Sequence, residues 1–177
     1  LSGLVGSETL GVTGAAANYA SANVDTYTVA VTYTLSDGSN GGLADNYSLA
    51  AGTASGSVTA KTLTIGVPSI ASRAYNGLTT AGTLTIGSLS GLVGSETLEV
   101  SGSAAAYTSA NVGSYSVAIT YTLGDDSGLA SNYSLANGTA TGTVTTKTVT
   151  IGAPTVATRE YDGTATAGTV TTGSLTG

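Results

Sequence analysis

Residues 114–123 read SYSVAITYTL, and this stretch decides the fold because its side chains alternate without interruption. Large apolar or aromatic residues occupy every second position from Tyr115 to Leu123, and Ser, Ala or Thr occupies each position between them. A period of two is typical of an antiparallel strand with one buried and one solvated face. Residues 27–35 repeat the pattern, so the sequence predicts two long strands of this kind.

Shorter alternations predict further strands at residues 61–67, 83–86, 96–100 and 139–145. Between the strands lie pairs that favour the positive backbone angles of tight turns. These pairs are Asp37-Gly38, Asn40-Gly41, Asn76-Gly77, Asn137-Gly138 and Asp162-Gly163. Because no stretch has a helical period, we expect an all-β protein made of tandem immunoglobulin-like β-sandwich repeats of about 87 residues. The alternative is another small all-β or β-grasp-like domain.

The chain repeats its own sequence. LSGLVGSETL stands at residues 1–10 and returns 88 residues later at 89–98, and the offset falls to 86 after a Gly- and Asp-rich loop. Solenoid coils usually run about 20 to 50 residues, so each longer unit here is expected to have its own core. Cutting before KTLTIG at Lys61 and KTVTIG at Lys147 predicts one complete repeat, residues 61–146. Residues 1–60 are then the C-terminal part of one repeat and 147–177 the N-terminal part of the next.

Composition argues against several classes of function. Without His or Cys the chain has no imidazole base, thiolate nucleophile or disulfide. Four cations against ten acids form no basic stripe for a phosphate backbone, and no apolar run approaches the roughly 20 residues of a membrane helix. We therefore expect no enzyme, no nucleic-acid partner and no membrane span in this segment. A surface built mostly of hydroxyls suits an extracellular protein.

Several motifs recur in a fixed order along the chain. They are KTLTIG at 61–66, a proline at 68, Arg-x-Tyr-Asn-Gly at 73–77, GLVGSETL at 91–98, ANVG at 110–113 and GLASNYSL at 128–135. This set resembles the YDG-type repeats of very large bacterial surface and secreted proteins, including filamentous haemagglutinin-like adhesins. The resemblance implies a stalk module outside the cell and no catalysis. Since Asn76 stands where the other copy has Asp162, and both residues suit a turn, the motif is predicted to be structural.

Acidic residues in two equivalent loops are candidate calcium ligands, because calcium takes six to eight oxygen ligands. They are Asp37, Asp45, Asp125 and Asp126. Their spacing lacks the alternating acids of a dedicated calcium loop, and the two loops do not match residue for residue. A solvated turn, with no metal and no other cofactor, is the favoured interpretation.

Lys61 and Lys147 are the only lysines and occupy the same position of the repeat. Some bacterial surface sandwiches join a strand-borne Lys to an Asn with a carboxylate assisting. Lys61, Lys147, Glu96 and Asn132 are therefore candidates for a covalent cross-link. The competing interpretation is an exposed Lys that protects an edge strand from pairing.

The favoured function is a structural spacer, in which sandwiches joined end to end form the stalk or fibre of a giant bacterial surface or secreted protein. Its partners would be neighbouring repeats of the same chain. One alternative is an adhesive module that binds glycans or cells through Tyr19 and Tyr107, or through Tyr47 and Tyr133. Another is lateral self-association of fibres in a filament or matrix through exposed edge strands.

Overall fold

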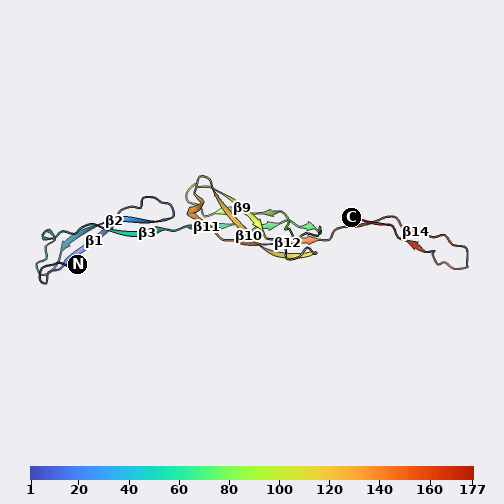
Figure 1. Cartoon of the computed structure of the whole chain (residues 1–177), viewed down its shortest axis with the longest axis horizontal. Coiled ribbons are helices and arrows are strands. Elements are labelled where there is room, and N and C mark those ends of the chain that lie inside the picture. Colours follow the sequence, from blue (N-terminus) through green and yellow to red (C-terminus); the bar gives the residue numbers. More distant parts are fainter. The chain divides into compact units, whose positions relative to one another are not determined.

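The structure is a computed structural model that describes residues 1–177, and it is all-β (Figure 1). Helical geometry is confined to two single 3₁₀ turns, η1 (Ala44–Asn46) and η2 (Ala130–Asn132), so no helix has the length and apolarity that crossing a membrane requires. The strands are β1 (Leu10–Ala16), β2 (Asp25–Asp37), β3 (Gly52–Val58), β4 (Lys61–Ile65), β5 (Ser69–Ile70), β6 (Arg73–Ala74), β7 (Leu84–Thr85), β8 (Leu89–Ser90), β9 (Leu98–Ala104), β10 (Gly113–Asp125), β11 (Tyr133–Leu135), β12 (Gly138–Thr145), β13 (Thr150–Ile151), β14 (Thr155–Val156), β15 (Val170–Thr171) and β16 (Leu175–Thr176).

The strands form several small sheets. One has the order β1-β2-β3 with antiparallel neighbours, and a four-stranded sheet has the order β6-β12-β10-β9, in which β6 runs parallel to β12. A third sheet has the order β11-β4-β8, and three further sheets are the pairs β5-β7, β13-β16 and β14-β15. The all-β prediction is confirmed.

The elements recur at the offsets of the sequence repeat. β1 and β2 return as β9 and β10 after 88 residues, for example Leu10–Ala16 as Leu98–Ala104. The loop that follows is two residues shorter in the second copy. Beyond it, η1, β5, β7 and β8 return as η2, β14, β15 and β16 at an offset of 86. Equal sequences at these positions thus adopt equal local structure.

The chain divides into two compact units, and each is described by itself. Unit 1 comprises Leu1–Leu63, Gly91–Glu99 and Gly124–Ser134, and unit 2 comprises Thr64–Ser90, Val100–Leu123 and Leu135–Gly177. Unit 1 therefore joins residues 1–63 to two loops of the predicted complete repeat. The boundaries predicted at residues 60 and 146 stay a prediction.

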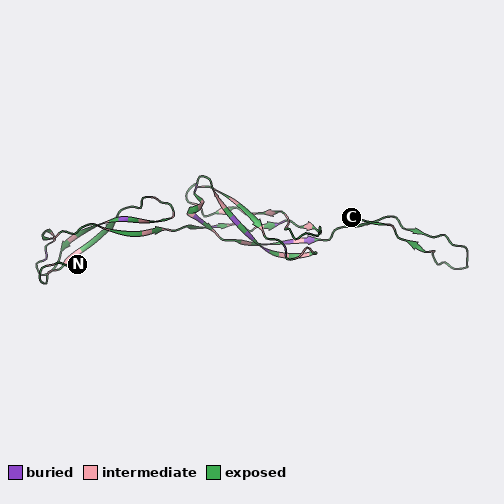
Figure 2. Cartoon of the chain, in the orientation of Figure 1, coloured by how far each residue is buried: buried purple, intermediate pink, exposed green.

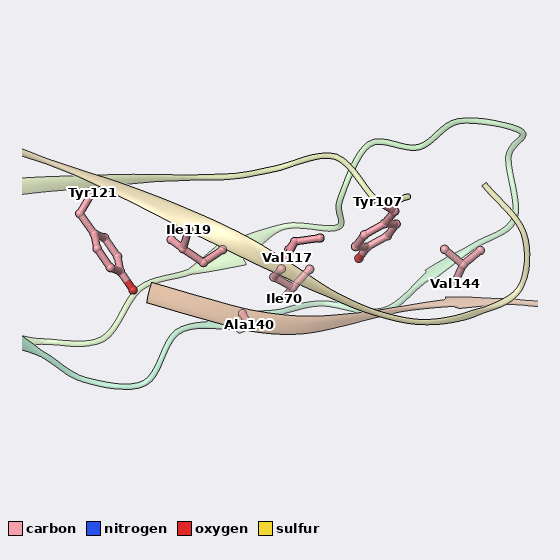
Figure 3. Packing of buried hydrophobic residues seen from close by; sticks show 7 residues of the cluster. All are labelled: Ile70, Tyr107, Val117, Ile119, Tyr121, Ala140 and Val144. Atoms are coloured by element: carbon pink, nitrogen blue, oxygen red, sulfur yellow. The ribbon is translucent and has the colours of Figure 1, made fainter. Parts of the chain in front are cut away.

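The main core lies in unit 2 and contains Ile70, Tyr107, Val117, Ile119, Tyr121, Ala140 and Val144 (Figure 3). Three of these residues come from the face of β10 that the alternation predicted to be buried, and the residues between them are exposed. Figure 2 shows the buried positions gathered mainly on β10 and β12. The predicted face of the long strand is therefore confirmed.

The predicted tight turns are only partly confirmed. Asn40, Gly41, Gly77 and Gly163 have the expected positive φ, but Gly38 and Gly138 do not. Gly138 belongs to β12 and pairs with Ile119 instead of forming a turn. A Cβ on Gly38 would collide with the carbonyl of Thr9, so this glycine is needed for a close backbone approach.

Candidate functional site

The Arg-x-Tyr-Asn-Gly motif forms a loop that its arginine holds together. The Arg73 guanidinium donates to the carbonyl oxygens of Thr80 at 2.8 Å and Leu78 at 2.5 Å. It also donates to Oδ1 of Asn76 at 2.8 Å, and Gly77 completes the turn with φ of 79°. Because a guanidinium presents five donors in a rigid fork, one side chain fixes three points of the loop.

The second copy of the motif has the same geometry. Arg159 donates to the carbonyl oxygens of Thr166 and Thr164, both at 2.6 Å, and to Oδ1 of Asp162 at 2.6 Å. Hydrogen bonds from the backbone N–H and hydroxyl of Thr164, and then from Arg159, hold the pKa of Asp162 below its ordinary value. Since Asn76 and Asp162 accept the same bonds, the loops support the structural interpretation of the motif.

The Arg73 loop covers Tyr107 within unit 2. The guanidinium carbon lies 5.4 Å from the centre of the Tyr107 ring, a cation–π contact. The N–H of Tyr107 donates to the Thr79 carbonyl at 2.7 Å, and the N–H of Gly82 donates to the Tyr107 hydroxyl at 3.3 Å. Tyr107 also stacks on Tyr115 with ring centres 5.1 Å apart. These contacts leave Tyr107 buried.

Unit 1 contains a cavity of about 240 Å³ where β3 meets β4, which we call the seam cavity. Its lining includes Lys61, Glu96, Asn132 and Tyr133, together with Asn23. Three of the four cross-link candidates therefore line one cavity. The fourth, Lys147, is exposed and does not belong to it.

Tyr133 and Glu96, which both line the seam cavity, are joined by a hydrogen bond. The Tyr133 hydroxyl donates to Glu96 Oε2 at 2.5 Å and accepts the N–H of Val93 at 3.1 Å. The same arrangement recurs at Tyr47, whose hydroxyl donates to Glu8 and accepts the N–H of Val5. The carboxylate acceptor raises the pKa of both tyrosines, because loss of the phenol proton would remove the hydrogen bond and place two anions side by side.

Tyr133 and Tyr47 are expected to lose their hydroxyl protons at a higher pH than an ordinary tyrosine, whose pKa is 10.0. Because the folded-state pKa is raised, the stabilisation is fully present below pH 10.0 and is lost as pH rises through the folded pKa. The ¹³Cζ chemical shifts of labelled tyrosine, followed against pH, measure this. Glu96→Gln should lower the pKa of Tyr133 alone, and Glu8→Gln should lower the pKa of Tyr47 alone. Equal titration of both tyrosines in all three proteins would contradict the assignment.

Asn132 joins two parts of unit 1 that are far apart in the sequence. Its Oδ1 accepts the N–H of Val24 at 2.8 Å, and its Nδ2 donates to Oδ1 of Asn23 at 2.9 Å. Asn23 belongs to the earlier predicted repeat and Asn132 to the complete one. Both ends of the Asn132 amide are therefore occupied by contacts with residues 23 and 24, on the other side of the predicted boundary.

The cross-link itself stays a prediction. Amide formation would require the Lys61 amine to attack the side-chain carbonyl of Asn132 and expel ammonia. Lys61 is exposed and forms no ion pair with Glu96, while the Asn132 amide is held by Asn23 and Val24. Loss of one ammonia from the intact mass would demonstrate the bond.

The calcium candidates do not converge on one point. No group of three or more acidic side chains is placed to hold a metal ion. Oδ1 of Asp37 accepts the N–H of Ala44 at 2.7 Å, and Oδ1 of Asp125 accepts that of Ala130 at the same distance. Asp45 and Asp126 are exposed. Asp37 and Asp125 thus have equivalent roles in closing their loops.

The four tyrosines considered for adhesion lie in different environments. Tyr107 and Tyr133 are buried, and Tyr47 is half-buried and bound to Glu8. Tyr19, which is 42% exposed and stacks on Tyr27, is the one whose ring is open to a ligand.

Sequence reasoning missed the roles of Arg73 and Asn23. The recurrence of Arg in both copies of the loop motif, and of ANV at residues 22–24 and 110–112, were the available signals. Neither signal specifies a contact, because the bonds of Arg73 depend on the loop geometry and Asn23 acts across 109 residues.

Comparison with known proteins gives one family match. Neither the curated proteins nor the solved structures contain a match to this chain. The family model of the YDG domain matches residues 59–142, which include the Arg73 loop, the Tyr133–Glu96 pair and the core strand β10. A YDG domain is thus detected by similarity at residues 59–142.

Proposed function

We propose that the chain is a spacer segment in the stalk of a large bacterial cell-surface or secreted fibre, built from tandem immunoglobulin-like sandwiches. Its task is to hold another part of the protein away from the cell, and it carries out no catalysis. The resemblance to adhesin repeats and the hydroxyl-rich, low-charge composition support an extracellular place. Neighbouring repeats of the same chain are its main partners.

The observation that carries the proposal is the direct junction between successive repeats. β3 ends at Val58 and β4 begins at Lys61, so only two residues separate the strands on either side of the predicted boundary. The Asn132 amide adds two hydrogen bonds, to Asn23 and Val24, across that boundary. A short, hydrogen-bonded junction restricts bending, as a stalk requires.

Packing in unit 2 supports the two-layered sandwich. Ile70 of β5 belongs to the core, and Leu84 of β7 packs against it, on the buried face of β10 and β12. The Tyr115 hydroxyl donates to the Asn111 carbonyl at 2.7 Å, a contact like the tyrosine corner of immunoglobulin-type sandwiches. Tyr27 makes the same bond to Asn23.

Electron microscopy of the intact fibre tests the spacer function. A ten-residue strand spans about 33 Å, so each repeat should lengthen the fibre by roughly 35 to 45 Å. An axial repeat far below this range would overturn the proposal.

Trypsin tests the junction in the 177-residue chain, which offers only four cleavage sites. Asn132→Ala removes both bonds across the boundary, so cleavage after Lys61 should accelerate several-fold. The matched control is Asn46→Ala, because Asn46 holds the equivalent position and makes no such contact with another repeat. Equal cleavage rates in the two variants would mean that Asn132 does not restrain the junction.

A further inference from the structure

Asn76 is followed by Gly77 in the Arg73 loop, and this pair brings a side-chain amide next to an unshielded backbone nitrogen. Because glycine has no Cβ, its nitrogen can approach the side chain of the residue before it. Asn76 is exposed, and a Cβ placed on Gly77 would meet no atom within 4 Å. Both the reacting groups and solvent therefore have room at this point of the loop.

The oxygen of the Asn76 amide accepts two hydrogen bonds. The Arg73 guanidinium donates to Oδ1 at 2.8 Å, and the N–H of Leu78 donates to the same atom at 3.0 Å. A nucleophile that attacks the amide carbon moves negative charge onto this oxygen, and donors already aimed at it stabilise that charge, as in an oxyanion hole. A hydrogen bond from a cation is the stronger kind. The Arg73 loop thus activates the Asn76 amide toward attack.

The other two Asn-Gly pairs of the chain have different surroundings. The Asn40 amide is held at its nitrogen, which donates to the Ser7 carbonyl at 2.8 Å. The oxygen of Asn137 accepts a long bond of 3.4 Å from the neutral N–H of Tyr121, and Gly138 is fixed in the ladder of β10 and β12. A guanidinium bonded to the amide oxygen therefore distinguishes the pair in the Arg73 loop.

The second loop contains the product that attack on this amide would give. At the equivalent position, Asp162 accepts a hydrogen bond from Arg159 at 2.6 Å and another from the N–H of Thr164 at 2.9 Å. Bonds from Thr164, and then from Arg159, hold the pKa of Asp162 below its ordinary value, so this loop favours an ionised carboxylate. An aspartate therefore fits the loop and gains an ion pair that the amide lacks.

We propose that Asn76 is a self-modification site, at which the chain converts its own asparagine into aspartate with water as the co-reactant. The Gly77 nitrogen gives its proton to solvent and bonds to Cγ of Asn76. The bond between Cγ and Nδ2 then breaks, ammonia leaves, and a five-membered succinimide remains. Water opens this ring and returns a proton to the Gly77 nitrogen. In sum, one amide and one water become one carboxylate and one ammonium ion, and nothing is oxidised or reduced.

The Arg73 loop should also decide which carbonyl of the succinimide the water attacks. Attack at Cγ breaks its bond to the Gly77 nitrogen and gives ordinary aspartate, whereas attack at the main-chain carbonyl gives isoaspartate, which predominates in flexible peptides. The donors of Arg73 and Leu78 polarise the Cγ carbonyl, so ordinary aspartate should predominate here. The loop over Tyr107 then acquires the same ion pair as the Arg159 loop.

Incubation of the 177-residue chain at neutral pH, followed by trypsin and tandem mass spectrometry, tests the proposal. Trypsin cuts after Arg73, so Asn76 is the third residue of its peptide. Aspartate should form at Asn76 more than about tenfold faster than at Asn40 or Asn137, and it should exceed isoaspartate. Retention of the Asn76 amide, or isoaspartate as the main product, would overturn the proposal.

Arg73→Gln removes the cation and keeps a hydrogen-bonding side chain at this position. Conversion of Asn76 should slow by more than about tenfold, and the share of isoaspartate among the products should rise. The product ratio separates activation by Arg73 from a merely structural role, because only activation of the Cγ carbonyl favours ordinary aspartate. An unchanged rate and product ratio in this variant would contradict the assignment.

Asp162→Asn supplies a second test that leaves the Arg73 loop intact. The introduced amide lies under Arg159 and precedes Gly163, so it should revert to ordinary aspartate. The matched control is Asp37→Asn, which also precedes a glycine but whose Oδ1 faces the neutral N–H of Ala44. This control should keep its amide over the same period. An Asp162→Asn chain that converts no faster than the Asp37→Asn chain would overturn the proposal.

Discussion

Replacing Ile119 by Ala should lower the free energy of unfolding of the predicted complete repeat by roughly 3 to 4 kcal/mol. Ile119 is a residue of β10 with no exposed surface, and it belongs to the core cluster. A cavity at this point loses packing on all sides, because the neighbouring strands cannot collapse into it. A small domain of this size has a stability of about 5 kcal/mol. Urea unfolding followed by circular dichroism should therefore show a strongly reduced midpoint.

Val31→Ala is the matched control for this variant. Val31 precedes Ile119 by 88 residues and holds the same place on β2, yet it is only half-buried. In the 177-residue chain its truncation should cost less than about 1 kcal/mol. If both variants lost similar unfolding free energy, Ile119 would be no better packed than Val31, and the prediction would be wrong.

The long strands were predictable because their signal is local. Alternation over residues 114–123 identified the buried face of β10, since a strand places successive side chains on opposite faces. The pairing of β6 with β12 has no such signal, because it joins Arg73 and Ala74 to a strand about seventy positions later. Gly138 shows a related limit: an Asn-Gly pair favours a turn, but the ladder with Ile119 decides its conformation.

The seam cavity was predictable in part. Lys61, Glu96 and Asn132, which the sequence grouped as cross-link candidates, do line one cavity, but Lys147, which holds the same position of the repeat as Lys61, does not. Their contacts were not predictable from recurrence. Asn132 is held by Asn23, which is 109 residues earlier in the chain, and Glu96 binds Tyr133 and forms no ion pair with Lys61.

Gly142→Ala should destabilise the predicted complete repeat by about 2 to 3 kcal/mol, because the added methyl group overlaps the hydroxyl of Tyr107. The Tyr107 ring carbon that bears the hydroxyl would lie 2.7 Å from the new Cβ. Tyr107 cannot move away easily, since Tyr115, the Arg73 guanidinium and the Thr79 carbonyl hold it in place. Hydrogen exchange at the amides of β12, measured with urea unfolding, should show faster opening of this strand.

Gly56→Ala introduces the same overlap at the equivalent position, where the new methyl group would meet the hydroxyl of Tyr19. Because Tyr19 is exposed, its ring can turn outward, and the cost in the 177-residue chain should stay below about 0.5 kcal/mol. Equal costs at Gly142 and Gly56 would mean that the cover over Tyr107 does not confine its ring.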